Sequence, residues 1–270
     1  MTWEKREKDG CVWYTLPEWE AMGARVVMST RVGGKGEVPY QSLNLALRVG
    51  DDSATVIENR KQFLKAVGWQ EKDFVSIRQV HGKEIVYADK TQCGRGFSDY
   101  EDCIADADGI FTDKKGPVMV TFYADCLPLA IFHPQKRLLG LAHAGWRGTF
   151  QNIGLSLINA MRMKADFDSS ELYVAVGAGI GACCYEVDAD FKERFCKEYA
   201  EAEDWFTAGE PGKYFFDNVK ANITLLQRAG VKASRISNLG LCTVCENHRF
   251  FSFRREQGKT GRHGLWGALI

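Results

Sequence analysis

Residues 118–148 read VMVTFYADCLPLAIFHPQKRLLGLAHAGWRG and contain two apolar runs, each followed by a side chain that can bind a metal or attack a substrate. The run at 118–123 is β-branched and aromatic, and the run at 138–142 is short and apolar, so each is typical of a buried strand. Cys126 follows the first run, and His143 follows the second. We expect these to be neighbouring strands that bring the thiol and the imidazole to one edge of a sheet.

A third candidate ligand lies upstream, in residues 74–89. The pattern there predicts two strands joined by a turn at His81 and Gly82, and a histidine at the tip of a hairpin is free to point at a partner. Two imidazoles and one thiolate suit zinc in a catalytic site, because the fourth position is left for water. The residue types therefore indicate a metal site at His81, Cys126 and His143.

Each of these residues also has an ordinary structural explanation. A cysteine in an apolar strand is often inert packing, and a lone histidine is often a satisfied turn residue. The residues that surround these candidate ligands favour a functional site over plain packing. Asp125 adjoins the thiol, and both His143 and Arg147 lie where a strand passes into a glycine-flanked helix start, which attracts anions.

The remaining patterns predict an α+β fold. Strands are expected at 11–16, 24–30, 171–176, 235–239 and 250–254, and helices between Ser53 and Gly68 and at 149–164, 188–199 and 217–229. Residues 91–109, which can border the pocket, and 206–213 are expected to form loops. The chain has no repeat, low-complexity tract or linker, so we expect residues 1–270 to form a single domain of mixed β-sheets flanked by helices.

Composition narrows the choice of partners. The chain has 35 basic and 35 acidic residues and no basic block, which argues against nucleic acid and anionic lipid as partners. The first residues, MTWEKREKDG, lack the apolar core of a signal peptide, and no apolar run approaches the ~18 residues that a membrane span needs. We therefore expect a cytoplasmic protein without a membrane partner, in which most of the nine cysteines are free thiols.

Two features leave their interpretation open. Arg31 ends a predicted strand in a glycine-rich loop, which suits either the approach of an anion or a plain surface loop. Cys242 and Cys245 form a Cys-x-x-Cys pair that, with His248, reads either as half of a zinc knuckle or as a redox pair. The adjacent cysteines 183 and 184 cannot easily bridge each other and are expected to be buried thiols.

Motifs spread from Ser29 to Arg262 resemble those of the laccase-domain, or polyphenol oxidoreductase, family. The matching stretches are Ser-Thr-Arg-x-Gly-Gly at 29–34, Ser-Leu-Asn-Leu at 42–45, Gln-Val-His-Gly at 79–82, Ala-Asp-Cys at 124–126, His-Ala-Gly-Trp-Arg-Gly at 143–148, Gly-Ile-Gly at 179–181, Tyr-Glu-Val at 185–187, Cys-Thr at 242–243 and Phe-Ser-x-Arg-Arg-x-x-x-x-Thr-Gly-Arg at 251–262. Members of this family are described as zinc-dependent purine nucleoside phosphorylases that also deaminate adenosine. The ordered combination of motifs is highly specific.

The resemblance implies a single domain of mixed sheets and helices that binds zinc through His81, Cys126 and His143, with copper as a substitute ion. It implies purine nucleosides and inorganic phosphate as substrates. The usual His-x-Glu signature of zinc deaminases is absent, so Asp125 is the candidate catalytic proton shuttle. The residues predicted to bind phosphate or substrate are Arg31, Asn44, Arg147 and Arg262.

Other functions remain in competition. Five histidines are too few for a mononuclear copper site together with a trinuclear cluster, so any polyphenol oxidase activity would come from copper in the zinc site. A cysteine hydrolase would use Cys126 as nucleophile and His143 as base. A zinc-stabilised binding module would have no turnover at all. The preferred nucleoside and the oligomeric state stay open.

Overall fold

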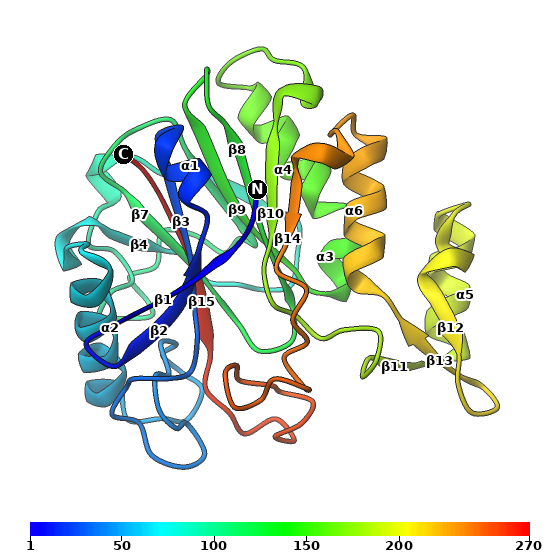
Figure 1. Ribbon diagram of the computed structural model, residues 1–270, viewed down its shortest axis with the longest axis horizontal. Coiled ribbons are helices and arrows are strands. Elements are labelled where there is room, and N and C mark those ends of the chain that lie inside the picture. The colour runs from blue at the N-terminus through cyan, green and yellow to red at the C-terminus, as the bar shows by residue number, and fades with distance from the viewer.

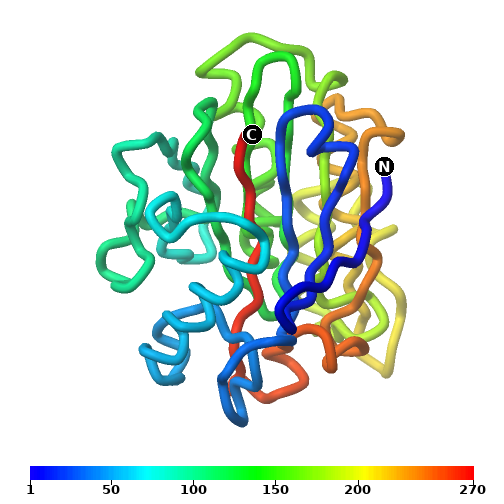
Figure 2. Tube along the Cα trace, turned by 60° about the vertical axis from the view of Figure 1, so that its left-hand side comes forward, coloured from blue at the N-terminus to red at the C-terminus, as the bar shows by residue number.

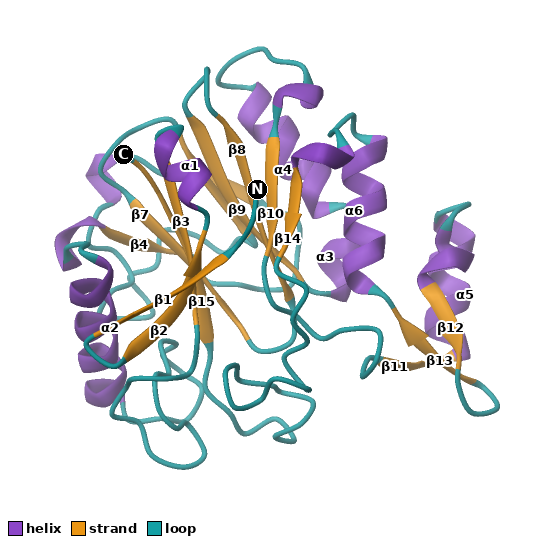
Figure 3. Cartoon of the chain, viewed as in Figure 1, coloured by secondary structure: helices purple, strands orange, loops and turns teal.

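Two six-stranded β-sheets, built mostly from the apolar runs of the sequence, pack face to face (Figures 1 and 3). A computed structural model describes residues 1–270. The first sheet has the strand order β1 (Glu4–Lys8), β2 (Cys11–Thr15), β3 (Ala24–Ser29), β15 (His263–Leu269), β7 (Val118–Tyr123) and β4 (Phe74–Ser76). The second has the order β14 (Ile236–Asn238), β10 (Tyr173–Val176), β8 (Leu127–His133), β9 (Leu138–Ala144), β6 (Gly109–Thr112) and β5 (Ile85–Tyr87).

The main core lies between the two sheets. Met28, Met119 and Leu265 from the first sheet contribute to the same buried cluster as Phe132 and Leu141 from the second. Removing this apolar surface from water is the principal force that holds the sheets together. The C-terminal strand β15 pairs with β3, so the two ends of the sequence meet in one sheet (Figure 2).

Helices cover both outer faces and give the molecule four layers (Figure 1). Helix α2 (Ser53–Val67) packs on the first sheet, and α3 (Trp146–Phe150), α4 (Ile153–Arg162) and α6 (Asn218–Arg228) lie on the side of the second. The Asp52 carboxylate accepts a hydrogen bond from the Thr55 amide at 2.8 Å and so caps α2, which ends at the left-handed Gly68.

Smaller elements complete the chain. A lobe that projects from one side contains α5 (Ala189–Glu198) and a three-stranded sheet of β11 (Glu186–Asp188), β13 (Lys213–Phe216) and β12 (Phe206–Ala208) (Figure 1). Helix α1 (Pro17–Ala21) lies between β2 and β3, and short 3-10 helices occupy Glu71–Asp73, Lys90–Gln92, Ser169–Glu171, Ala202–Trp205 and Ala233–Arg235. None of the helices combines the length and apolar character that a membrane span needs.

The α+β class is confirmed, but the hairpin expected at residues 74–89 is wrong. Strand β4 pairs with β7 in the first sheet, whereas β5 pairs with β6 in the second. The intervening residues therefore cross from one sheet to the other, and His81 lies on this crossing. Both short runs are apolar, and periodicity does not tell which partner a strand will choose.

The expectation that residues 118–123 and 138–142 are neighbouring strands is also wrong. They belong to β7 and β9, which lie in different sheets, and the strand beside β9 is β8, which the sequence reading did not assign. The chain crosses from β7 to β8 through Ala124–Cys126, and Asp125 takes a positive φ of 83° to make the turn. Cys126 thus lies on a second crossing between the sheets.

Further differences lie near the C-terminus and in the helices. Residues 250–254 contain no strand, and the strand β15 that forms the middle of the first sheet was not anticipated. The helix expected at 149–164 is two helices, because Asn152 between them has a φ of 54°. Residues 206–213 contain β12 and the start of β13 in place of the expected loop.

Candidate metal centre and cavity

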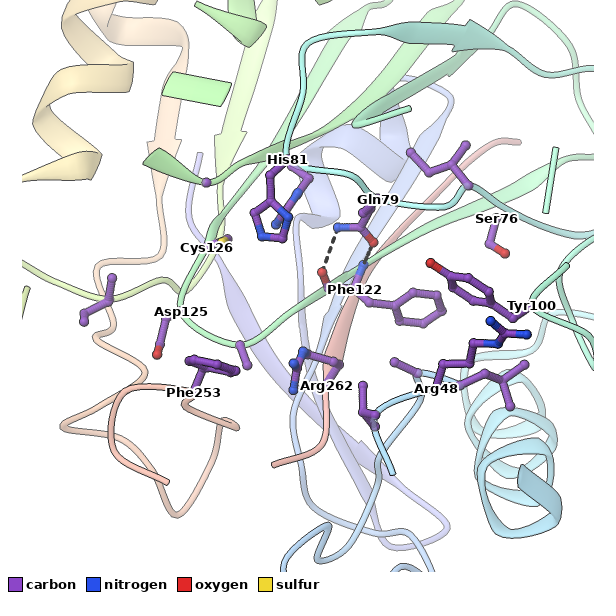
Figure 4. Close-up of a pocket in the computed structure, with 18 of the residues that line it drawn as sticks. Arg48, Ser76, Gln79, His81, Tyr100, Phe122, Asp125, Cys126, Phe253 and Arg262 are labelled. Atoms are coloured by element: carbon purple, nitrogen blue, oxygen red, sulfur yellow. Dashed lines mark hydrogen bonds between the residues drawn. The ribbon is translucent and has the colours of Figure 1, made fainter. Parts of the chain in front are cut away.

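The three predicted ligands meet at one end of the two-sheet core. His81 comes from the crossing between β4 and β5, Cys126 from the crossing between β7 and β8, and His143 from the end of β9. Their ligand atoms all lie within 4.8 Å of one another. Figure 4 shows His81 and Cys126 side by side at one end of a cavity. Residues that are distant in the sequence therefore converge because two chain crossings occur at the same end of the sheets.

A fully buried carboxylate, Asp108, holds this arrangement in place. It accepts hydrogen bonds from the backbone amides of Val80, His81 and Gly82 at 3.1, 3.0 and 2.6 Å. Its Oδ1 lies 2.7 Å from Nδ1 of His143. Because Nδ1 of His143 is hydrogen-bonded to Asp108, Nε2 of His143 is the nitrogen that can bind a metal or the thiol.

Sequence reading missed Asp108, although a signal for it existed. A metal-binding histidine commonly donates its second ring N–H to a carboxylate. The run Ala-Asp-Ala-Asp-Gly at 105–109 offers two candidates, Asp106 and Asp108. Only the fold decides between them, because Asp108 is fully buried beside His143 while Asp106 lies at the surface and pairs with Arg78.

The local charges favour a thiolate. Burial alone would raise the pKa of Cys126, but the charge of His143 and hydrogen bonds from His143 and His81 lower it to about 6. Burial would lower the pKa of His143, but the Cys126 thiolate and the Asp108 carboxylate raise it to about 9. Burial likewise works against ionisation of Asp108, yet His143 and the amides of Gly82 and Val80 lower its pKa.

These residues fit a zinc ion. Two imidazoles and a thiolate are zinc ligands, the thiolate is the form that binds metals, and Asp108 supplies the carboxylate that orients a coordinating histidine. Gly145 leaves space beside them, because a Cβ at this position would come within 3.0 Å of Sγ of Cys126 and 3.3 Å of Cδ2 of His81. The donor set thus provides three protein ligands and opens onto the cavity.

The cavity has a volume of about 490 Å³, which is within the range of small-molecule sites. In Figure 4 it extends from His81 and Cys126 past Phe122 to Arg48 and Tyr100. The other aromatic rings that line it are Trp146, Tyr185 and Phe253. Tyr100 comes from the expected loop at 91–109, which does border the pocket as predicted.

Four arginines, at positions 48, 60, 254 and 262, line the cavity. Arg262 donates to the carbonyls of Thr260 and Gly261 at 2.7 and 2.9 Å and forms no ion pair with a carboxylate. Arg60 is fully buried and also donates only to carbonyls, and this burial lowers its pKa to about 9. Arg48 pairs with the exposed Glu101. Cationic groups with few acidic partners make the cavity attractive to an anion.

The other predicted site residues lie in different places. Asp125 lines the cavity, where its carboxylate accepts hydrogen bonds from the Thr243 hydroxyl and the Arg254 amide, both at 2.6 Å. Arg147 is exposed on α3, with its guanidinium 4.5 Å from the centre of the Trp146 ring.

Like Arg147, two further predicted binding residues do not line the cavity. Asn44 is fully buried. Its side-chain oxygen accepts a hydrogen bond from the Arg262 amide at 2.8 Å, and its side-chain nitrogen donates one to the Asp51 carboxylate at 2.9 Å. Arg31 borders a separate cavity and pairs with Glu256 at 3.0 Å. Of the four predicted phosphate or substrate residues, only Arg262 is among those that line the main cavity.

Comparisons with known proteins agree with one another. Residues 25–268 match the family described as "Multi-copper polyphenol oxidoreductase laccase". "Purine nucleoside phosphorylase YlmD" of Geobacillus stearothermophilus is 36% identical over 241 residues, covering 89% of this chain and 88% of that protein. The protein of the same name from Bacillus subtilis is 32% identical over 234 residues, covering 87% and 84%. The crystal structure of the hypothetical protein YfiH from Bacillus licheniformis has a TM-score of 0.93 and 29% identity, covering 98% and 99%.

We predict that Asp108→Asn weakens zinc binding by about 10- to 100-fold, because the amide no longer fixes His143 as a charged acceptor does. The measurement is competition for zinc with a chromophoric chelator, together with circular dichroism to check folding. Asp106→Asn, which alters the surface carboxylate of the same run, is the matched control. Equal affinities for the two variants would show that Asp108 does not support the site.

A second prediction concerns the metal-free protein. The lowered pKa means that Cys126 is a thiolate above about pH 6, so its alkylation by iodoacetamide should rise through pH 6 and level off above it. The rate is followed by mass spectrometry of the peptide that contains Cys126, and Cys126→Ser identifies its share of the reaction. A midpoint near the ordinary thiol pKa would contradict the pairing with His143.

Proposed function

The chain belongs to the multi-copper polyphenol oxidoreductase laccase family, and on that premise we propose that it is a zinc-dependent purine nucleoside phosphorylase. The reaction converts adenosine, inosine or guanosine to the free purine and ribose 1-phosphate, and adenosine deamination is a second activity of the same site. One observation carries the proposal: the ligands His81, Cys126 and His143 open onto a cavity that is lined by aromatic rings and arginines.

The cavity offers contacts for both substrates of such a reaction, the purine nucleoside and phosphate. Phe122, Tyr185 and Phe253 offer ring faces on which a purine can stack. Arg262 and Arg48 can each hold phosphate with two parallel hydrogen bonds, because the planar guanidinium presents paired N–H donors. An aromatic base and an anion can therefore be accommodated together.

The remaining predicted residues have supporting places in this scheme. Asn44 is proposed to support phosphate binding indirectly, because its side-chain oxygen accepts a hydrogen bond from the Arg262 amide and so holds Arg262 in place. Arg147, next to the lining residue Trp146, is proposed to bind phosphate at the mouth of the cavity. Arg31 is proposed to keep the segment that contains Glu256 in position, because its guanidinium holds that carboxylate and the carbonyl of Asn247.

In phosphorolysis, a phosphate oxygen bonds to C1′ of the ribose while the bond from C1′ to the base breaks, and the departing base takes up a proton. We assign the proton shuttle to Asp125, whose carboxylate lines the cavity next to Cys126 and is oriented by Thr243 and Arg254. When bound, zinc supplies Lewis-acid polarisation of an oxygen on the substrate or on water. Copper in the same three ligands is the proposed source of any oxidase activity.

A second candidate function is favoured by one observation. Cys126, His143 and Asp108 stand in the order nucleophile, base and orienting acid that cysteine hydrolases use, and the pKa of Cys126 is already lowered to about 6. A thiolate that binds zinc is a poor free nucleophile. Metal content therefore separates the two functions: stoichiometric zinc in the active protein favours the phosphorylase, and activity of the metal-free protein favours the hydrolase.

The proposed reaction predicts that zinc-loaded protein releases hypoxanthine and ribose 1-phosphate from inosine only when phosphate is present. Products are measured by chromatography, and adenosine is tested in parallel for conversion to inosine. His81→Ala should abolish both reactions, whereas His248→Ala, which changes an exposed histidine away from the cavity, should leave them intact. Hypoxanthine released without phosphate would identify a hydrolase and refute phosphorolysis.

We also predict that Arg262→Lys lowers kcat/KM for phosphate by about 10- to 100-fold, because lysine keeps the charge but loses the planar pair of donors. The effect should appear mainly in KM for phosphate, with KM for inosine little changed, in steady-state assays that vary one substrate at a time. Arg228→Lys on α6, an exposed arginine paired with Glu201, is the matched control. An unchanged KM for phosphate would place the anion elsewhere.

A further inference from the structure

Four cysteines form a second cluster of ligand atoms, outside the centre described above. Cys183 and Cys184 lie in the loop that follows β10, and Cys242 and Cys245 lie in the turn that follows β14. Their Sγ atoms all lie within 4.8 Å of one another. Contrary to the expectation of buried thiols, Cys183 is exposed and Cys184 is half-buried. The isolated Cys-x-x-Cys pair of the sequence thus has its second pair 58 to 62 positions earlier in the chain.

The spacing of the sulfurs matches a tetrahedral metal site. A zinc ion with bonds of about 2.3 Å to four thiolates places the sulfurs about 3.8 Å apart. Sγ of Cys245 lies 3.6 Å from Sγ of Cys183 and 3.6 Å from Sγ of Cys184. A disulfide requires about 2.05 Å, and all four cysteines are free thiols. The cluster therefore has the dimensions of one coordination shell.

The backbone segments that contain the two cysteine pairs contact each other and the sulfurs. The Gly181 amide donates a hydrogen bond to Sγ of Cys242 at 3.2 Å, and such bonds stabilise a metal-bound thiolate. A Cβ at Gly181 would come within 3.3 Å of Sγ of Cys183, so the glycine permits this close approach. A parallel bridge between Gly179 and Cys242 and a hydrogen bond from the Thr243 amide to the Gly179 carbonyl fix the register of the two segments.

Positive charge lies near the cluster. Four thiolates around a divalent cation carry a net negative charge, which nearby cations reduce. The guanidinium of Arg255 donates to the carbonyl of Val244, inside the Cys-x-x-Cys turn, at 3.1 Å. The guanidinium of Arg254 donates to the carbonyl of Glu186, two residues after Cys184, at 3.1 Å. Neither guanidinium donates to a carboxylate; only the backbone amide of Arg254 does so, to Asp125.

We propose that Cys183, Cys184, Cys242 and Cys245 together bind a structural zinc ion. All four positions of a tetrahedral ion are filled by protein sulfur, which is characteristic of structural and not catalytic zinc. The proposal is independent of the reaction assigned to the cavity, because it uses none of the three ligands of that site.

The position of the cluster gives the ion a structural role. Cys184 directly precedes Tyr185, which lines the cavity, and Cys242 directly precedes Thr243, whose hydroxyl holds Asp125. One ion would therefore join the base of the projecting lobe, where β11 begins, to the segment that supports the cavity wall (Figure 1). Other links between these segments include the bridge from Gly179 to Cys242 and the Arg254 guanidinium, which donates to the Glu186 carbonyl.

The test begins from the His81→Ala variant, which lacks one of the three ligands of the main site. The full-length variant is purified under reducing conditions, loaded with zinc and desalted, and its metal is measured by mass spectrometry. We expect one zinc ion per chain in His81→Ala, two in the wild type and none in His81→Ala combined with Cys245→Ser. Cys196→Ser, which changes a half-buried cysteine of α5 outside the cluster, should keep two.

Three further measurements guard against a variant that misfolds. Cys245→His should retain the ion, because three cysteines and one histidine also form a structural zinc site. Loading His81→Ala with cobalt should give the intense thiolate-to-cobalt absorption of a sulfur-only site, and chelation should make the exposed Cys183 and Cys245 react rapidly with iodoacetamide. The proposal is overturned if zinc-loaded His81→Ala contains no metal, if alkylation of these cysteines is as fast with zinc as without, or if the purified chain carries a disulfide between them.

Discussion

The buried carboxylate of Asp108 is the constraint on which the main site depends. Such a charge is expensive to remove from water unless donors surround it, and here three backbone amides and one imidazole do so. The same contacts fix the left-handed turn at His81 and the orientation of His143. Satisfying one buried charge therefore also positions two of the three candidate ligands.

The two-sheet core explains why the site lies where it does. The chain passes between the sheets at 77–84 and again at 124–126, and each passage occurs at the same end of the core. A chain that leaves a sheet must turn sharply, and the positive φ of His81 and of Asp125 marks these turns. The irregular backbone thus presents reactive side chains, while rigid strands on both sides keep them in register.

The cysteines of the chain divide according to their surroundings. Cys126 faces two imidazoles, which favour its ionised form and suit it to metal or covalent chemistry. Cys11 lies in the core, where burial raises the pKa of its thiol to about 11 and leaves it as packing. Each cysteine of the group at 183, 184, 242 and 245 has the Sγ atoms of the other three within 4.8 Å of its own. Residue type alone does not assign these roles.

The sequence by itself determined the mixed α+β class, the positions of α2 and the early strands, the family likeness and the residue types that suit a metal site. The family likeness follows from the ordered motifs between Ser29 and Arg262, and the rest follows from local periodicity, helix caps and ligand chemistry. Only the tertiary structure decided which strands pair, that Asp108 and not Asp106 supports His143, that Asn44 and Arg31 lie outside the cavity, and that two cysteine pairs meet. The reason is physical: strand pairing and burial depend on contacts between distant segments, and no local pattern encodes the partner.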